Sequence, residues 1–165
     1  MLLIRNPLRA ILSSYKHKMN GVHSGTEAIM RNNLGRLINK PTENIIRISQ
    51  LEKFALEQIE NWRNIIKDWV TVGQVIVVFF EDVEEDKVRE LTRIFQFLDL
   101  SVNENRLNCI RNAPIDLYKR KTSAYPEISM FSENLKDKIA STIDQVNAIL
   151  KVFGHQQLPE HYYAF

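Results

Sequence analysis

The feature that most constrains the fold is an uninterrupted apolar run from Val75 to Phe80. A strand without polar alternation is typical of a parallel sheet, where both faces are covered. The run is far shorter than the ~20 residues that a membrane span requires. The first residues, Met1 to Ile4, are also apolar and predict a second buried strand. Because two strands are few for a parallel sheet, we expect further strands upstream in a longer natural protein, or support from another element.

Helical periodicity predicts the rest of the chain. Pro7 opens the first helix, where its missing N–H is not needed. Ser101 and Glu104 match a capping box, and Ser132 is positioned to cap the last long helix. The helices are expected at residues 7–20, 49–70, 88–98, 101–112 and 132–154. Strands that alternate with helices predict an α/β fold with a parallel sheet, in one domain over residues 1–165.

Apolar stripes predict which helix faces point toward the core. The stripe of helix 49–70 includes Trp69, and that of helix 88–98 includes Leu98. Both side chains are therefore expected to be buried. The aromatic residues of the tail, Tyr162, Tyr163 and Phe165, are expected to be exposed, and they offer an alternative role as a protein-interaction surface.

The charge balance limits the classes of partner. The 165 residues include 22 basic and 20 acidic ones, for a net charge of +2. This balance argues against bulk electrostatic binding to nucleic acid or to a membrane, so an anion site has to come from a few placed cations. Cys109 is the only cysteine, which excludes an internal disulfide, and no zinc-ligand spacing is present. Arg5 interrupts the apolar start too early for a signal peptide.

The first candidate anion site is Arg5-Asn6-Pro7, where the first strand meets the first helix. Ligands of open parallel sheets bind beyond the carboxyl ends of the strands. A helix N-terminus there attracts anions, and the arginine fork matches a phosphate. Ser13, two helical turns further on, is placed to reach the same anion. The alternative is that Arg5 pairs with a structural carboxylate and that Ser13 is a surface residue.

The second candidate is the basic segment Tyr118-Lys119-Arg120-Lys121, in a predicted loop. An aromatic ring beside cations suits an adenosine phosphate, and the alternative is a solvated basic turn. A third candidate, Glu81-Asp82, directly follows the apolar strand. It would orient a cation or a hydroxyl, but a structural role as a helix cap is favoured. No histidine is placed at a reacting group, so no catalytic residue is assigned.

These segments occur in an order that resembles the sulfotransferase superfamily, and most closely the WSC domain-containing sulfotransferases. The pair Arg5 and Ser13 has the spacing of that family's 3′-phosphate-binding motif. The similarity runs from Leu2 to about Phe153. Its other parts are Leu2–Ala10, Asp68–Val70 with Gly73, Val75–Val83, Phe95–Leu100 and Tyr118–Thr122.

The resemblance implies a fold, a reaction and a set of binding residues. The fold would be a P-loop-NTPase-like three-layer sandwich with a parallel sheet. The co-substrate would be 3′-phosphoadenosine 5′-phosphosulfate, without a metal, and the acceptor a hydroxyl group such as one on a glycan. Arg5 and Ser13 would bind the 3′-phosphate, Arg120 and Lys121 would bind it from the other side, and Tyr118 would pack near the adenine. A full-length protein would be located in the Golgi membrane, with a lumenal domain.

Two departures from the family pattern affect these expectations. Thr122 stands where the family has a glycine, which alters the close approach of backbone to phosphate. The family's N-terminal phosphosulfate loop, of the Lys-Ser-Gly-Thr-Thr type, has no counterpart in this sequence. We therefore expect a domain truncated at its N-terminus and inactive without that loop. The alternative is a non-catalytic, sulfotransferase-like remnant or protein-interaction module. The segment from Gly21 to Pro41 is expected to contact the acceptor.

Overall fold

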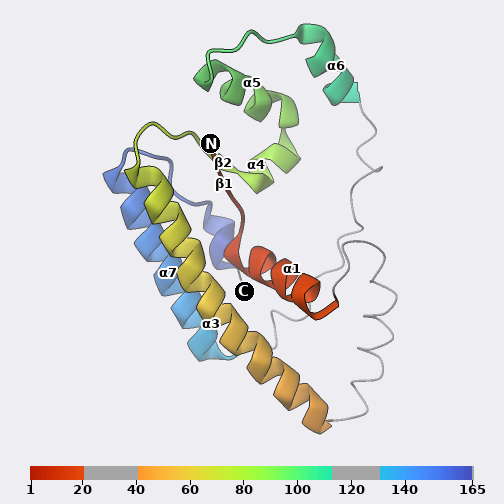
Figure 1. Cartoon of the computed structure of the whole chain (residues 1–165), viewed down its shortest axis with the longest axis vertical. Coiled ribbons are helices and arrows are strands. Elements are labelled where there is room, and N and C mark those ends of the chain that lie inside the picture. Colours follow the sequence, from red (N-terminus) through yellow and green to blue (C-terminus); the bar gives the residue numbers. More distant parts are fainter. Residues whose placement is uncertain (21–40, 113–130, 165) are drawn as a thin grey trace.

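The computed structural model describes residues 1–20, 41–112 and 131–164 (Figure 1). Its sheet consists, within these ranges, of strands β1 (Leu2–Ile4) and β2 (Val77–Phe79), which pair in parallel. Leu2 lies opposite Val77 and Ile4 opposite Phe79, and the Leu2 N–H donates to the Ile76 carbonyl at 2.8 Å. The predicted parallel pairing of the two apolar segments is therefore confirmed.

Helices make up most of the remaining described chain. In Figure 1, α3 and α7 lie side by side along their lengths, α1 packs against α3, and α4 to α6 form a group on the other side of the strands. The elements are α1 (Pro7–Asn20), α3 (Pro41–Thr71), α4 (Phe80–Glu85), α5 (Lys87–Phe97), α6 (Glu104–Asn112), α7 (Glu133–Val152) and the 3₁₀ helix η3 (Glu160–Tyr163).

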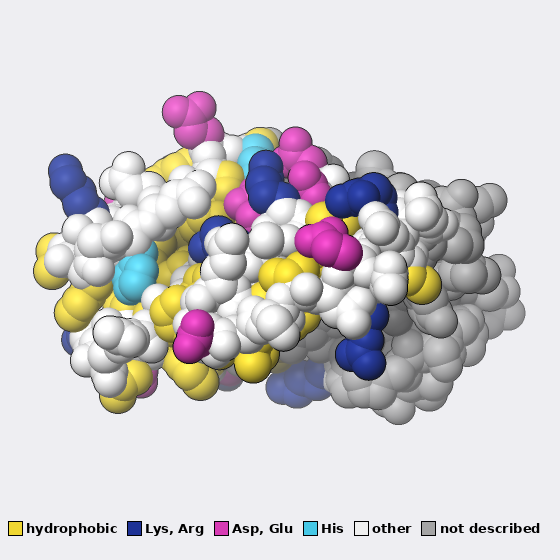
Figure 2. Space-filling view, turned by 90° about the horizontal axis from the view of Figure 1, so that it is seen from above, with side chains coloured by type: hydrophobic (Ala, Val, Ile, Leu, Met, Phe, Trp, Pro, Cys, Tyr) yellow, Lys and Arg dark blue, Asp and Glu magenta, His cyan; other side chains and the backbone are white. Residues whose placement is uncertain are grey.

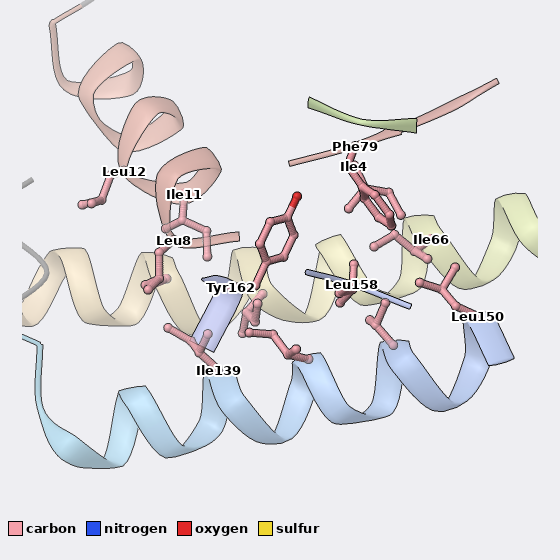
Figure 3. Close-up of a cluster of buried hydrophobic side chains, with 14 of the residues drawn as sticks. Ile4, Leu8, Ile11, Leu12, Ile66, Phe79, Ile139, Leu150, Leu158 and Tyr162 are labelled. Carbon is pink, nitrogen blue, oxygen red and sulfur yellow. The ribbon is translucent and has the colours of Figure 1, made fainter. Parts of the chain in front are cut away.

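The hydrophobic core lies between the strands, α1, α3 and α7. Leu2 and Ile4 of β1 and Val77 and Phe79 of β2 belong to this core. The Tyr162 ring from η3 lies in the same cluster, near Ile4 and Phe79 (Figure 3). Leu3, on the opposite face of β1, is 50% exposed, whereas its neighbour Val78 is fully buried. The sheet is thus covered on both faces along β2 and only on one face along β1, which differs from the expectation of a fully buried first strand.

Helix α7 follows its sequence pattern closely. The Ser132 hydroxyl accepts a hydrogen bond from the Leu135 N–H, as a helix cap does. Gly154 ends the last turn with a φ of +71°, a conformation that glycine adopts without steric cost. Its buried face consists of Leu135, Ile139, Thr142, Ile143, Val146 and Leu150. The predicted cap, stripe and glycine stop are all confirmed.

Several boundaries differ from the prediction. Helix α3 begins at Pro41 rather than at Ser49, because proline is accepted in a first helical turn. Strand β2 ends at Phe79, since Phe80 already belongs to α4. Asn103 rather than Ser101 caps α6, as its side-chain oxygen accepts from the Arg106 N–H at 3.1 Å.

Besides Leu3, three other side chains have an environment that differs from the prediction. Trp69 is 48% exposed on α3, and Leu98 is 50% exposed just beyond α5, although both were expected in the core. Conversely, Tyr162 has no exposed surface, so it cannot contribute to an exposed aromatic patch. Periodicity assigns a side chain to a face of its own helix, but it does not determine which other element covers that face.

Candidate functional site

The candidate site lies where the two parallel strands end. Arg5 and Asn6 directly follow β1, and Phe80 and Glu81 directly follow β2. Because Ile4 is paired with Phe79, these four residues lie side by side at the carboxyl edge of the sheet. The N-terminus of α1 begins at the same place, which is where open parallel sheets bind their ligands.

Within the described residues, Arg5 contacts an aromatic ring and no carboxylate pairs with it. Its guanidinium carbon lies 4.6 Å from the centre of the Phe80 ring, a cation–π geometry. Its Nε atom is buried and has no hydrogen-bond partner in the structure. No ion pair among the described residues involves Arg5, so the predicted alternative of a structural carboxylate partner is not observed there. A buried donor without a partner is unusual and suits a site that awaits an anion.

Asn6 caps α1 and joins the two strand ends. Its side-chain oxygen accepts from the Arg9 N–H at 3.3 Å, and its carbonyl accepts from the Ala10 N–H at 3.0 Å. Its own N–H donates to Oε1 of Glu81 at 3.2 Å. Sequence reasoning relied on Pro7 for the helix start and missed Asn6 as the cap, although asparagine directly before proline is a capping signal.

Glu81 has a structural role, but not as a helix cap. The N-cap of α4 is Phe79, which makes no side-chain capping bond. Instead, Oε1 of Glu81 accepts from Asn6, and Oε2 accepts from the Tyr162 hydroxyl at 2.5 Å. Burial of Tyr162 raises the pKa of its hydroxyl, and the hydrogen bond to Glu81 and its negative charge raise it further, while Arg5 opposes the rise. The hydroxyl therefore remains protonated and acts as a donor.

Ser13 lies half-buried on the second turn of α1, in the strand–helix unit that carries Arg5. The structure thus confirms the predicted local elements, while the joint binding role of Arg5 and Ser13 stays a prediction. The remaining predicted binding residues, Tyr118, Arg120 and Lys121, lie outside the described residues. So do Thr122 and residues 21–40 of the segment expected to contact the acceptor, whereas Pro41 is the first residue of α3.

A second charged cluster covers the outer edge of β2. Arg93 of α5 donates to the Val77 carbonyl at 2.9 Å and pairs with Glu90 at 2.6 Å, and Glu90 is 4% exposed. Burial raises the pKa of the nearby Asp82, and the negative charge of Glu90 raises it further. Arg93 thus donates to a backbone carbonyl of β2, whose strand partner among the described residues is β1 alone, and sequence reasoning did not identify this structural role.

Three further properties of the described residues are their surface charge, their metal-ligating side chains and the apolar length of their helices. Figure 2 shows acidic and basic side chains interspersed over the described part of one face, without a large patch of one sign. Within residues 1–20, 41–112 and 131–164, no cluster of His, Cys, Asp and Glu is arranged to hold a metal ion. None of the helices in the described ranges is long and apolar enough to cross a membrane.

Comparison with protein families decides the classification. The model of the sulfotransferase domain family matches residues 1–147. This chain belongs to the sulfotransferase domain family. It is 25% identical over 123 residues to WSCD family member CG9164 of Drosophila melanogaster, which covers 73% of this chain and 35% of the relative. It is 26% identical over 123 residues to WSCD family member GA21586 of Drosophila pseudoobscura pseudoobscura, with the same two coverages. No solved structure matches the chain significantly.

Family membership confirms the predicted resemblance and gives the strand ends a context. A sulfotransferase domain implies a P-loop-like α/β fold, and the parallel β1–β2 pair is consistent with that fold. The matched region contains Arg5, Ser13 and Glu81. Tyr162 lies beyond it, although its hydroxyl reaches the same strand ends. The chain spans 35% of the length of these relatives.

Proposed function

We propose that this chain supplies the 3′-phosphate-binding part of a sulfotransferase. The reaction would transfer a sulfuryl group from 3′-phosphoadenosine 5′-phosphosulfate to a hydroxyl acceptor, with a glycan as the proposed class. The transferred group would move in line from the phosphate of the donor to the acceptor oxygen. Catalysis would come from positioning and from stabilisation of the charge that develops on the leaving phosphate.

The observation that carries the proposal is the environment of the Arg5 side chain. The side chain lies at the carboxyl edge of a parallel sheet, is stacked on Phe80, and has a buried Nε without a partner. The stacking orients the planar guanidinium, and among the described residues no carboxylate pairs with its charge. A phosphate would satisfy the buried donor and would lie near the positive end of the α1 dipole.

The other proposed contacts come from the family pattern. Ser13 would donate its hydroxyl to the 3′-phosphate, Arg120 and Lys121 would bind the phosphate from the opposite side, and Tyr118 would pack near the adenine. We also propose that the chain belongs to one sulfotransferase domain with a three-layer architecture. For the full-length protein we propose the Golgi membrane, with this domain in the lumen, a location that fluorescence microscopy of the tagged full-length protein would test.

Calorimetric titration with adenosine 3′,5′-bisphosphate tests the proposal directly. AMP is the matched control ligand, because it lacks only the 3′-phosphate. We expect the chain to bind the bisphosphate more tightly than AMP. Equal binding of both, or no binding by a chain shown to be folded by circular dichroism, would contradict a 3′-phosphate site and favour a non-catalytic, protein-interaction role.

Replacing Arg5 should remove the main contact. We expect Arg5→Ala to weaken bisphosphate binding by about 1.5–3 kcal/mol, the range for a charge-assisted hydrogen bond, and to leave AMP binding unchanged. Arg5→Lys should recover only part of the loss, because lysine keeps the charge but lacks the planar fork. Arg111→Ala, on the distant surface of α6, is the control. Full affinity in Arg5→Ala would exclude Arg5 from the site without affecting the family assignment.

A further inference from the structure

The last described segment of the chain is anchored to α7 by its own hydrogen bonds. The Leu158 N–H donates to Oδ1 of Asn147 at 2.8 Å, and the Tyr163 hydroxyl donates to Oδ1 of Asp144 at 2.6 Å. Nδ2 of Asn147 donates to the Tyr163 hydroxyl at 3.1 Å. Together with the burial of Leu158, these contacts fix the start and the end of η3 on α7.

From this anchored segment, Tyr162 extends across the core toward the strand ends. Its ring packs edge-on against Phe79 with centroids 6.4 Å apart, and it has no exposed surface. Figure 3 shows the hydroxyl pointing out of the hydrophobic cluster, away from α7. A phenylalanine would fill the same space without burying a hydroxyl. The buried hydroxyl therefore requires a hydrogen-bond partner to offset the cost of removing it from water. Glu81 is that partner.

The two oxygens of Glu81 are each occupied by one donor. Oε2 accepts from Tyr162 at 2.5 Å, and Oε1 accepts from the Asn6 N–H at 3.2 Å. Arg5 precedes Asn6, and its guanidinium is stacked on Phe80, the residue before Glu81. A carboxylate and a guanidinium thus lie at neighbouring positions of paired strand ends and still form no ion pair with each other in the structure.

We propose that Tyr162 is a positioning residue that keeps the Glu81 carboxylate away from Arg5, so that Arg5 remains available for the 3′-phosphate. This inference rests on the proposed function of Arg5. Without the Tyr162 hydroxyl, Oε2 of Glu81 loses its donor, while Nε of Arg5 is a buried donor that has no hydrogen-bond partner in the structure. An Arg5–Glu81 pair would then compete with the phosphate for the same cation.

Tyr162 extends the proposed site beyond the region that the family model matches. Residues 1–147 match the sulfotransferase domain, whereas Tyr162 comes from the segment that follows. The hydrogen bond joins two residues that are 81 positions apart in sequence. Through it, Tyr162 would keep the negative charge of Glu81 from pairing with Arg5. A purely structural tyrosine would affect folding stability only, whereas a positioning tyrosine affects ligand affinity through Glu81.

Bisphosphate titration of four variants of the 165-residue chain tests this proposal. We expect Tyr162→Phe to weaken binding about tenfold, because a released carboxylate competes for Arg5. Tyr163→Phe is the matched control, since it removes a neighbouring hydroxyl that contacts only α7 among the described residues, and it should bind as the wild type does. Circular dichroism and thermal unfolding verify that each variant is folded.

Removing the charge of Glu81 distinguishes a positioning role of Tyr162 from a role in folding stability alone. The double variant Tyr162→Phe/Glu81→Gln should recover affinity to within about threefold of the wild type, because glutamine cannot form an ion pair with Arg5. Glu81→Gln alone should tighten binding about threefold by removing a negative charge near the bound phosphate. This single variant also provides a readout if Tyr162→Phe does not fold.

The outcomes are distinguishable. If the wild type shows no preference for the bisphosphate over AMP, the proposed function fails, and this inference fails with it. If the wild type binds but Tyr162→Phe binds equally well, only the role of Tyr162 is overturned. If Tyr162→Phe is weak and the double variant remains weak, Tyr162 acts through core packing and not through Glu81, which also overturns the proposal.

Discussion

Helices α7 and α5 have similar amphipathic patterns but opposite environments. The apolar stripe of α7 is buried against α3, the strands and η3, and Leu150 has no exposed surface. In α5, the only buried residue is the charged Glu90, while Leu91, Ile94 and Phe95 are half-buried. Phe97, at the end of this helix, and Leu98, just after it, are exposed.

The difference shows that the two sides of the sheet are stabilised in different ways. The α3–α7 side gains its stability from removing apolar surface from water. The α4–α6 side is attached at β2 through the Glu90–Arg93 pair and the bond from Arg93 to the Val77 carbonyl. The candidate site lies between them, and Tyr162 reaches it from the apolar side.

The largest difference in unfolding free energy should appear when one leucine on each side of the sheet is truncated to alanine. We expect Leu150→Ala to destabilise the protein by about 2–5 kcal/mol, because it opens a cavity in a packed core. Leu98→Ala removes the same atoms from an exposed position and should change stability by less than about 0.5 kcal/mol. Urea unfolding followed by circular dichroism measures both. Similar losses in the two variants would show that Leu98 is covered in solution.

A smaller effect should separate the two arginines that contact Glu90. Arg93 binds both Glu90 and the Val77 carbonyl, so Arg93→Met should cost about 1–3 kcal/mol. Arg89 reaches Glu90 only at 3.3 Å and is more exposed, so Arg89→Met should cost at most about 0.5 kcal/mol. The same urea experiment compares them. An equal cost would indicate that the strand-edge bond contributes nothing.

The smallest effect concerns the ion pair between α3 and α7. The hydrogen bond from Lys138 holds the pKa of Glu60 below its ordinary value of 4.5, with help from Arg63. Between the folded-state pKa and pH 4.5, the folded state therefore binds fewer protons than the unfolded state. The contribution of the ion pair to stability is present above pH 4.5 and is lost as pH falls through the folded-state pKa.

Glu60→Gln should accordingly cost about 0.5 kcal/mol at neutral pH, a value typical of partly exposed pairs. The difference from the wild type should vanish in acid, below the folded-state pKa of Glu60. Thermal unfolding from neutral to acid pH provides the measurement, and Glu57→Gln on the exposed surface of α3 is the control. A cost that persists in acid would show that the side chain matters through packing and not through its charge.

Local signals were the reliable part of the sequence prediction. The apolar run at Val75, the cap at Ser132 and the stop at Gly154 act within a few residues, and each has its predicted outcome in the structure. Errors arose where the result depends on a distant element. Trp69 and Leu98 fit the apolar stripes of their helices, but no described element covers them sufficiently to bury them.

The candidate site was predictable only in part. Arg5 was found because an arginine between a strand and a helix has a local signature, and the family pattern supports the choice. The partners of Glu81 were not found, because Asn6 and Tyr162 lie 75 and 81 positions away in sequence. Hydrogen bonds over such separations leave no periodic signal in the sequence, so only the folded chain reveals them.

The sequence by itself determined that this protein forms two parallel strands joined by amphipathic helices, and that an arginine follows the first strand at a helix start. These properties depend on backbone preferences and on the spacing of apolar residues along one segment. Only the tertiary structure decided that Arg5 is stacked on Phe80 while Glu81 is engaged by Asn6 and Tyr162. The physical reason is that the choice of partner for each charge depends on which segments the packed core brings into hydrogen-bond distance.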